Sequence, residues 1–270
     1  MNTKIIGICN QKGGVSKTTS ACSLASALAL NHNKKILIID FDPQGNSSLV
    51  FGVIAKYEEP TVTSWILKKT SFSETVRHVR KNIDLLPSNI GLDEITAHFA
   101  GKIAAEKTLL KALAQTEESA NYDYIIIDSN PHLDLLTQNV LCASDEVLIP
   151  MQPEAFSMQG MVALLNTIWD VQEDINPDLV INGLLFTKVD TRRASVKIER
   201  DFVTKNICKP RNIYLYESMI KQLTDYAECS NYKKTIYEYK PKGSAVNNFN
   251  EFVKEFLKRE KQINKEREGK

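Results

Sequence analysis

The chain has 270 residues, of which 43% are hydrophobic and 25% are charged, and its 34 Lys and Arg nearly balance its 33 Asp and Glu. This composition is typical of a globular protein and excludes an intrinsically disordered chain. Five scattered cysteines without a C-x-x-C pair favour neither a disulfide framework nor a zinc site. The N-terminus lacks a signal-like apolar stretch, and no apolar run approaches about 20 residues. We therefore expect a cytoplasmic protein that does not bind a membrane.

Short β-branched segments alternate along the chain with segments of helical periodicity. The pattern predicts strands at 4–9, 35–40, 83–87, 122–128, 146–150, 180–187 and 213–216, and helices at 17–31, 61–69, 91–115, 134–143, 157–173, 194–206 and 246–265. Several strands are apolar on both faces, as in parallel sheets covered by helices. We predict a single α/β domain over residues 1–270, with a doubly wound, mostly parallel sheet flanked by helices. The charge-dense tail, residues 259–270, is expected to fray.

A glycine-containing loop follows the first expected strand and leads into a helix that begins near Lys17. Glycines in such a loop let backbone N–H groups turn toward anionic oxygens, and the helix N-terminus adds partial positive charge. Lys17 can reach the β- and γ-phosphates of a nucleotide, and the Thr18 hydroxyl can bind Mg²⁺. The predicted nucleotide-binding residues are Lys12, Gly13, Gly14, Val15, Ser16, Lys17, Thr18 and Thr19.

Carboxylates stand at the ends of two other apolar strands. Asp40 and Asp42 end the second strand, and residues two apart on a strand point to the same side, here toward the crevice. One of them can hold Mg²⁺ through water while the other positions the attacking water. The strand Tyr124-Ile-Ile-Ile-Asp128 places a further carboxylate beside the Mg²⁺ bound by Thr18.

These segments together resemble the ParA/MinD family of P-loop ATPases, which have a deviant Walker A loop. Residues 12–19 match the family pattern K-G-G-x-x-K-T-T, and residues 40–46 match D-x-D-P-Q-G-N. The family's D-x-P-P segment corresponds to residues 128–131, with Asn130 as a departure. Residues 147–157 and 236–245 are similar to the family's strand-to-helix segment beside the nucleotide and to its closing turn. The resemblance therefore extends from residue 3 to about residue 258.

The resemblance implies an ATPase that uses ATP and Mg²⁺ and hydrolyses weakly unless it is stimulated. Lys12 matches the family's signature lysine, which crosses a dimer interface to the partner's phosphates, so an ATP-sandwich homodimer is implied. A cation from the facing subunit would stabilise the charge that develops at the γ-phosphate. The implied catalytic residues are Lys12, Lys17 and Asp42, and the implied metal-binding residues are Thr18, Asp40 and Asp128.

Ser16 departs from the family pattern, which has glycine at that position. A side chain there is tolerated if the local φ is negative, whereas a positive φ strains the loop. We expect nucleotide binding to survive this departure and intrinsic hydrolysis to be slow.

The near-zero net charge hides an uneven distribution. Residues 188–270 hold 20 Lys and Arg against 12 Asp and Glu, whereas residues 1–187 hold 14 against 21. The basic part, about 188–258, can meet DNA phosphates without reading sequence. Asp190-Thr191-Arg192 resembles the family's D-x-R segment, in which the arginine contacts DNA. The expected DNA-binding residues are Arg192, Arg193, Lys197, Arg200, Lys221, Lys233 and Lys234.

The sequence separates several branches of the family. We expect the ParA/Soj type, which segregates a plasmid or chromosome, binds DNA non-specifically in its ATP state, is nucleoid-associated, and is stimulated by a centromere-binding ParB-like protein. An ATPase that positions a protein assembly on the nucleoid shares these motifs and is the alternative. A MinD-like membrane ATPase is disfavoured because residues 261–270 hold one apolar residue. A metal-cluster carrier is disfavoured because residues 97–103 and 129–134 lack cysteine.

One further pattern concerns the choice of nucleotide. Residues 187–190, Thr-Lys-Val-Asp, resemble the guanine-reading N-K-x-D of GTPases. Since the family has a similar segment and uses ATP, we expect ATP rather than GTP to be the nucleotide.

Overall fold

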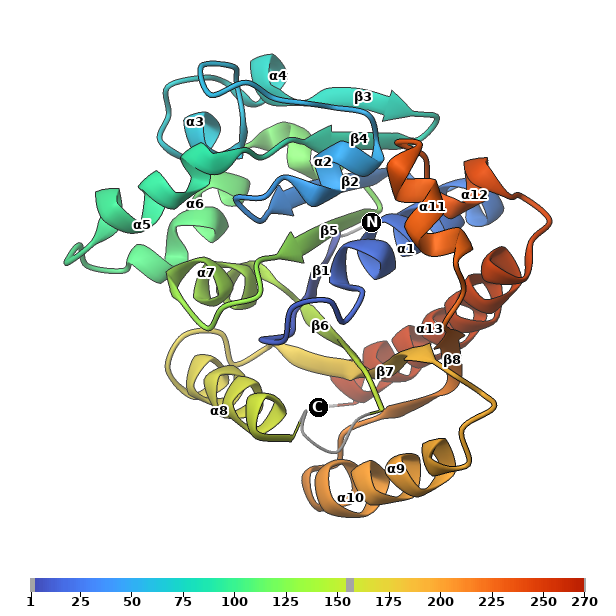
Figure 1. The fold of residues 1–270 in the computed structure, drawn as a ribbon. Helices are drawn as coiled ribbons and strands as arrows, with labels where there is room; N and C mark the ends of the chain where they lie inside the picture. Colours follow the sequence, from blue (N-terminus) through green and yellow to red (C-terminus); the bar gives the residue numbers. More distant parts are fainter. Residues whose placement is uncertain (1–2, 154–157, 270) are drawn as a thin grey trace.

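The computed structural model describes residues 3–153 and 158–269, with backbone alone for residues 158 and 159. In this part of the chain, eight strands form one sheet in the order β3-β4-β2-β5-β1-β6-β7-β8 (Figure 1). Each neighbouring pair is parallel except β3 with β4. The strands are β1 Lys4–Ile8, β2 Ile36–Phe41, β3 Arg77–Arg80, β4 Ile83–Leu86, β5 Tyr124–Ser129, β6 Glu146–Met151, β7 Val180–Val189 and β8 Leu215–Lys221.

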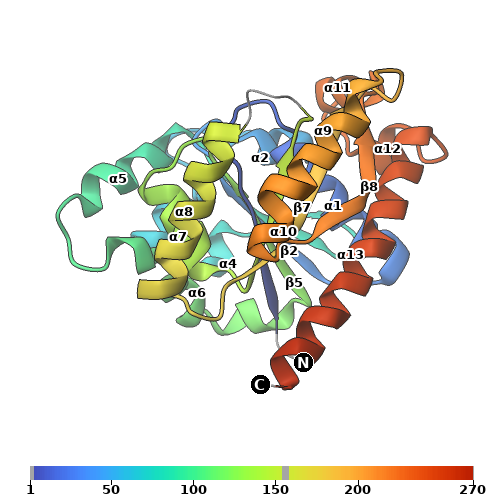
Figure 2. The same ribbon diagram turned by 90° about the horizontal axis from the view of Figure 1, so that it is seen from below.

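Helices cover both faces of this sheet, as Figures 1 and 2 show. One face packs against α3, α5, α6, α7, α8 and α9, and the other packs against α1, α2, α11, α12 and α13. The helices are α1 Lys17–His32, α2 Asn46–Val50, α3 Val62–Ile66, α4 Phe72–Thr75, α5 Asp93–Phe99, α6 Thr108–Ala114, α7 Leu135–Ala143, α8 Met158–Asp174, α9 Ser195–Val203, α10 Lys209–Arg211, α11 Asp225–Asn231, α12 Ile236–Tyr239 and α13 Ser244–Glu268.

The predicted α/β class and doubly wound, mostly parallel sheet are confirmed. Strands β2, β5 and β6 are buried at every position, as the consecutive apolar residues in each of them predicted. No helix in the described residues is long and apolar enough to cross a membrane.

Several element boundaries differ from the sequence predictions for local reasons. The short antiparallel edge strand β3 was not predicted, because its sequence Arg-His-Val-Arg has one apolar residue. The single helix expected at 91–115 is instead divided into α5 and α6, with Gly101 and Ala104 in left-handed conformations between them. The expected helix at 61–69 is shorter because Lys68 has a φ of 59°.

The last expected strand, 213–216, lies further along the chain as β8. Tyr216 and Ile220 are buried and Glu217 and Lys221 are exposed, so β8 has the partly exposed pattern of an edge strand. The polar residues within β8 interrupt its apolar pattern, so the sequence did not indicate its full length.

The prediction that residues 259–270 fray is wrong for the described part of this tail. Helix α13 continues to Glu268 (Figure 2). Ile263 is 1% exposed. Buried Glu260 accepts a hydrogen bond of 2.7 Å from the Tyr124 hydroxyl. Arg267 donates to the backbone oxygens of Asp145 and Asp178 at 3.0 and 2.8 Å. The tail is ordered because its long charged side chains reach the sheet while its apolar residue packs inward.

Candidate functional site

The loop between β1 and α1 is held from one side by the ends of β6 and β7. The Thr187 hydroxyl, at the end of β7, donates to the backbone oxygen of Val15 at 2.9 Å and to that of Met151 at 3.2 Å. The Gln152 amide, just after β6, donates to the backbone oxygen of Gly14 at 3.1 Å. These bonds satisfy loop carbonyls, so the loop is fixed in place before any ligand arrives.

Asn10 fixes the start of the same loop, and sequence reasoning did not assign it a role. Its side-chain amide donates to the backbone oxygen of Pro150 at 2.6 Å, and its side-chain oxygen accepts from the backbone N–H of Lys12 at 2.9 Å. An Asn three residues before a loop glycine is a weak sequence signal, because Pro150, to which its amide donates, lies 140 residues away on β6.

Ser16 has the left-handed conformation that the sequence left undecided. Its φ is 65° and its ψ is 32°, and it is the N-cap residue of α1 without a side-chain capping hydrogen bond. Gly14, two residues earlier, has a φ of 75°. Glycine adopts such angles at no steric cost, whereas a residue with a Cβ atom is strained by roughly 1–2 kcal/mol. The departure at Ser16 therefore strains the loop at the start of its helix.

Lys17 is almost fully covered although it carries a charge. It is 7% exposed, and burial lowers the pKa of its ammonium group while the charges of Asp128, Cys9 and Asp42 raise it. A desolvated ammonium group at a helix N-terminus is stabilised by an anion bound beside it. Lys17 is thus placed to bind phosphate oxygens.

Asp40 and Asp128 lie side by side on the neighbouring strands β2 and β5, and both are 0% exposed. One oxygen of Asp128 accepts from the Ser47 hydroxyl at 2.7 Å. One oxygen of Asp40 accepts from the backbone N–H and the hydroxyl of Ser48, each at 2.7 Å. The Oδ1 atoms of both carboxylates lack a hydrogen-bond partner. Buried polar oxygens almost always have a hydrogen-bond partner, so the two unpartnered oxygens indicate a binding site for a ligand.

The electrostatics of the pair lead to the same conclusion. Burial, and then the charge of Asp128, raises the pKa of Asp40 to about 8. Burial raises the pKa of Asp128 to about 6, against hydrogen bonds from Ser47 and Thr18 that lower it. Two buried carboxylates that repel each other are stabilised by a shared cation or a proton.

The donor set fits a magnesium ion. Mg²⁺ typically binds one or two protein carboxylates and completes its shell with water and phosphate oxygens. The described residues hold no cluster of three or more His, Cys, Asp or Glu arranged around a metal. Asp40, Asp128 and the hydroxyl of Thr18 provide the smaller set of oxygens that magnesium prefers.

Asp42 lies just beyond the end of β2, in the turn that leads to α2. It is 6% exposed and accepts a hydrogen bond of 2.9 Å from the backbone N–H of Gln44. Burial raises its pKa, while the charges of Lys17 and His132 lower it. The structure therefore brings the three predicted carboxylates and Lys17 together at the carboxyl ends of β1, β2 and β5.

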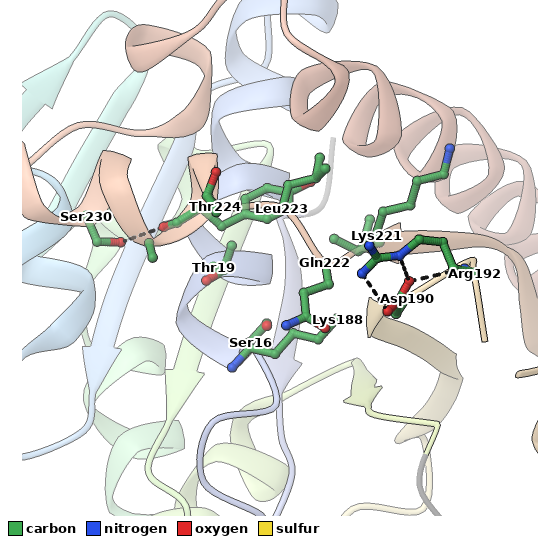
Figure 3. Close-up of a pocket in the computed structure, with 13 residues that line it drawn as sticks. Ser16, Thr19, Lys188, Asp190, Arg192, Lys221, Gln222, Leu223, Thr224 and Ser230 are labelled. Atoms are coloured by element: carbon green, nitrogen blue, oxygen red, sulfur yellow. Dashed lines mark hydrogen bonds and ion pairs between the residues drawn. The ribbon is translucent and has the colours of Figure 1, made fainter. Parts of the chain in front are cut away.

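A pocket of about 690 Å³ opens beside the phosphate loop (Figure 3). Ser16 and Thr19 form one wall, and the segment from the end of β8 into α11 forms the other. Sequence reasoning missed this second wall, which comprises Ile220, Lys221, Gln222, Leu223, Thr224, Tyr226, Ala227 and Ser230. No local pattern marks these residues, because their relation to the loop arises only when β8 joins the sheet edge beside β7.

Arg192 and Asp190 form an ion pair at the edge of this pocket (Figure 3). The guanidinium donates to both carboxylate oxygens, at 2.8 and 2.9 Å, and these bonds lower the pKa of Asp190 to about 2. Asp190 is the acid of the Thr-Lys-Val-Asp segment that resembles a guanine-reading motif. Its carboxylate is already engaged by Arg192, which agrees with the expectation that guanine is not read here.

The other basic residues expected to bind DNA differ in their availability. Arg200 is the most constrained, because its guanidinium donates to the backbone oxygen of Tyr216 at 2.8 Å and pairs with Glu217 at 3.0 Å. Arg193 pairs with Glu199 at 3.4 Å. The exposed lysines are Lys197 on α9, Lys221 at the end of β8, and Lys233 and Lys234 after α11. They come from separate elements of the fold.

Asn130, the departure from the D-x-P-P segment, is tied into the turn after β5. Its amide donates to Asp134 at 2.8 Å, and its oxygen accepts from the Thr137 hydroxyl at 2.9 Å. Asn130 therefore braces the N-terminus of α7. Of the segment 147–157, residues 154–157 lie outside the described residues, so the expectation for them stays a prediction.

This chain is similar in sequence and in structure to known proteins. A family model described as an AAA domain matches residues 3–181. The sporulation initiation inhibitor protein Soj of Bacillus subtilis is 35% identical over 93% of this chain and 97% of its own length. The chromosome partitioning protein ParA of Myxococcus xanthus is 33% identical over 95% and 89%. The structure of cobyrinic acid a,c-diamide synthase from Mycobacterium smegmatis, with bound ATP analogue and magnesium, is 28% identical, covers 96% of both chains and has a TM-score of 0.82.

Proposed function

This chain belongs to the ParA/Soj family of partition ATPases, and from that membership we propose that it segregates a plasmid or chromosome as an ATP-dependent dimerising switch. The observation that carries the ATPase part of the proposal is the convergence of Lys17, Asp42 and the Asp40–Asp128 pair at one edge of the sheet. A buried cation beside paired, partly unsatisfied carboxylates is the arrangement that Mg²⁺-bound phosphate requires.

The residues of the site have different roles in phosphoryl transfer. The loop N–H groups and Lys17 bind the phosphates, whose negative charge offsets the burial that lowers the pKa of Lys17. Thr18, Asp40 and Asp128 hold Mg²⁺, which neutralises phosphate charge when it is bound. Asp42 lies near Lys17 and orients the attacking water as a hydrogen-bond acceptor.

The finer steps follow from the family membership. In the ATP state, Lys12 of each subunit reaches the partner's phosphates, and the closed dimer places two basic surfaces side by side. The dimer then binds DNA without sequence preference. A centromere-binding ParB-like protein stimulates hydrolysis, which opens the dimer and releases the DNA.

Two substitutions test the proposed cycle at opposite points. Lys12→Ala should leave nucleotide binding intact and abolish dimer-dependent hydrolysis. Asp42→Ala should bind ATP and remain as a dimer on DNA, because the attacking water is no longer positioned. Lys35→Ala, which removes an exposed lysine at the opposite end of β2, is the matched control. Size-exclusion chromatography measures dimerisation, an ATP turnover assay measures hydrolysis, and co-sedimentation with DNA of unrelated sequence measures DNA binding.

The outcomes separate the proposal from other roles of the same fold. Absence of ATP-dependent DNA binding in both the native protein and Asp42→Ala would overturn the DNA-binding switch and favour an enzyme that uses ATP for another synthesis. A protein that positions an assembly on the nucleoid would pass these tests. Stimulation of hydrolysis by a centromere-binding protein distinguishes partition from that alternative.

A further inference from the structure

Lys188 has an unusual backbone conformation near the end of β7. Its φ is 51°, in the left-handed region, although it lies between the buried residues Thr187 and Val189. A residue with a Cβ atom rarely adopts this conformation. Residues with such backbone strain are often found at active sites and ligand-binding sites. In this conformation the exposed side chain of Lys188 reaches the edge of the phosphate loop.

The ammonium group of Lys188 faces Gly14 of that loop. Its Nζ atom is 4.0 Å from the position that a Cβ atom on Gly14 would take. Lys188 also lines the 690 Å³ pocket together with Ser16 and Thr19 (Figure 3). The charge is therefore at the junction between the loop that cradles phosphates and the pocket beside it.

Within the described part of the chain, no ion pair joins Lys188 to an acid. Among the residues that line the pocket, the cations are Lys188, Arg192 and Lys221, and the acid is Asp190. Asp190 is engaged through both oxygens by Arg192. Among the described lining residues, positive charges therefore outnumber the single negative charge, and the charge of Lys188 lies next to Gly14.

We propose that Lys188 contacts the nucleotide directly and binds oxygens of its α-phosphate and ribose. The inference rests on the proposed nucleotide binding. If Lys17 holds the β- and γ-phosphates, the chain of phosphates runs along the loop and the nucleoside enters the adjoining pocket. The α-phosphate and ribose then lie at the junction where the ammonium group stands. Sequence reasoning treated Lys188 as part of an accidental match to a guanine-reading motif.

The test compares three ligands with Mg²⁺ present: ATP, ADP and inorganic pyrophosphate, whose two phosphates can occupy the β- and γ-positions and which lacks the α-phosphate, ribose and base. Lys188→Met should weaken ATP and ADP binding by about tenfold each, because a charge-assisted hydrogen bond is lost in both complexes. Binding of pyrophosphate should change less than about twofold, because it makes only the contacts of the loop and Lys17. Lys188→Arg should retain most of the affinity. Isothermal titration calorimetry measures all three ligands.

Lys221→Met is the matched control, because it removes the same charge from the same pocket. Its side chain extends away from Ser16 in Figure 3, so its affinities should equal those of the native protein. If Lys188→Met fails to fold, Lys188→Asn repeats the measurement, since asparagine tolerates a positive φ.

Three results would overturn the inference. Native affinity for ATP and ADP in Lys188→Met would show that there is no contact. An equal loss for pyrophosphate would show that the loop is distorted instead. Absence of nucleotide binding by the native protein would refute the proposed function as well, so the two failures are distinguishable.

Discussion

At the scale of single residues, the phosphate loop combines tight anchoring with local strain. Hydrogen bonds from Thr187 and Gln152 hold the loop carbonyls, while Ser16 keeps a φ of 65° that favours glycine. Strained residues of this kind persist when their surroundings over-determine them. The strain is therefore a property of the folded loop that the anchors maintain.

Replacing Ser16 with glycine should stabilise the protein. Ser16→Gly removes the Cβ atom that clashes in the left-handed conformation, and we expect the free energy of unfolding to rise by about 1 kcal/mol. Ser16→Ala is the control, because it removes the hydroxyl and keeps the Cβ atom. Urea unfolding monitored by circular dichroism measures both variants. Equal stability of the alanine and glycine variants would contradict the strain.

At the scale of elements, α13 shows how a charged sequence can still be a packed helix. Its earlier turns bury Phe249, Phe252 and Phe256, and its last turns use Ile263 and Arg267 to reach the sheet. Charge density along the chain suggested fraying because it records composition and not the direction of each side chain. The aliphatic parts of long charged residues cover apolar surface while their heads reach polar partners.

The docking of this helix end can be measured by a cavity-forming substitution. Ile263→Ala should lower the free energy of unfolding by about 2–4 kcal/mol, because Ile263 is 1% exposed and its side chain packs in the interior. Gln262→Ala, an exposed neighbour on the same turn, should change it by less than about 0.5 kcal/mol. Equal, small effects in chemical denaturation would mean that the tail is frayed after all.

At the scale of the whole molecule, the sheet separates the carboxylates from the basic segments. Asp40 and Asp128 lie near the ends of β2 and β5, and Asp42 follows β2. Arg192 follows β7 and Lys221 ends β8, at one edge of the sheet. The pocket beside the phosphate loop connects these two regions. A nucleotide in the pocket would therefore lie next to the basic segments, which supports the proposed dependence of DNA binding on ATP.

This arrangement predicts a steep salt dependence of DNA binding in the ATP state. For about six phosphate contacts, the affinity of Asp42→Ala with ATP should fall by about a thousandfold between roughly 50 and 200 mM salt. Lys197→Ala should reduce the slope of log affinity against log salt by about one, because one contact is lost. Lys261→Ala, in the tail, should leave the slope unchanged. Fluorescence anisotropy with a labelled duplex gives these slopes, and a salt-independent affinity would refute the electrostatic contact.

The sequence alone determined the features that depend on neighbours along the chain. Apolar runs identified the buried strands β2, β5 and β6, and the loop from Lys12 to Thr19 was recognisable because its glycines, lysine and threonine are adjacent. The carboxylates Asp40, Asp42 and Asp128 were recognisable because each ends an apolar run or follows one closely. Strand order in such a sheet brings the carboxyl ends of these strands together, so the core of the site was predictable.

Only the tertiary structure showed the features that involve residues far apart in sequence, or that depend on whether a φ angle is positive or negative. The φ of Ser16, the pairing of Asp40 with Asp128, and the β8–α11 wall of the pocket are set by how separate strands align. The same holds for Lys188, whose approach to Gly14 joins residues 174 positions apart. Local patterns record propensity and polarity, whereas these contacts arise from packing, which alone fixes the distance and direction between side chains.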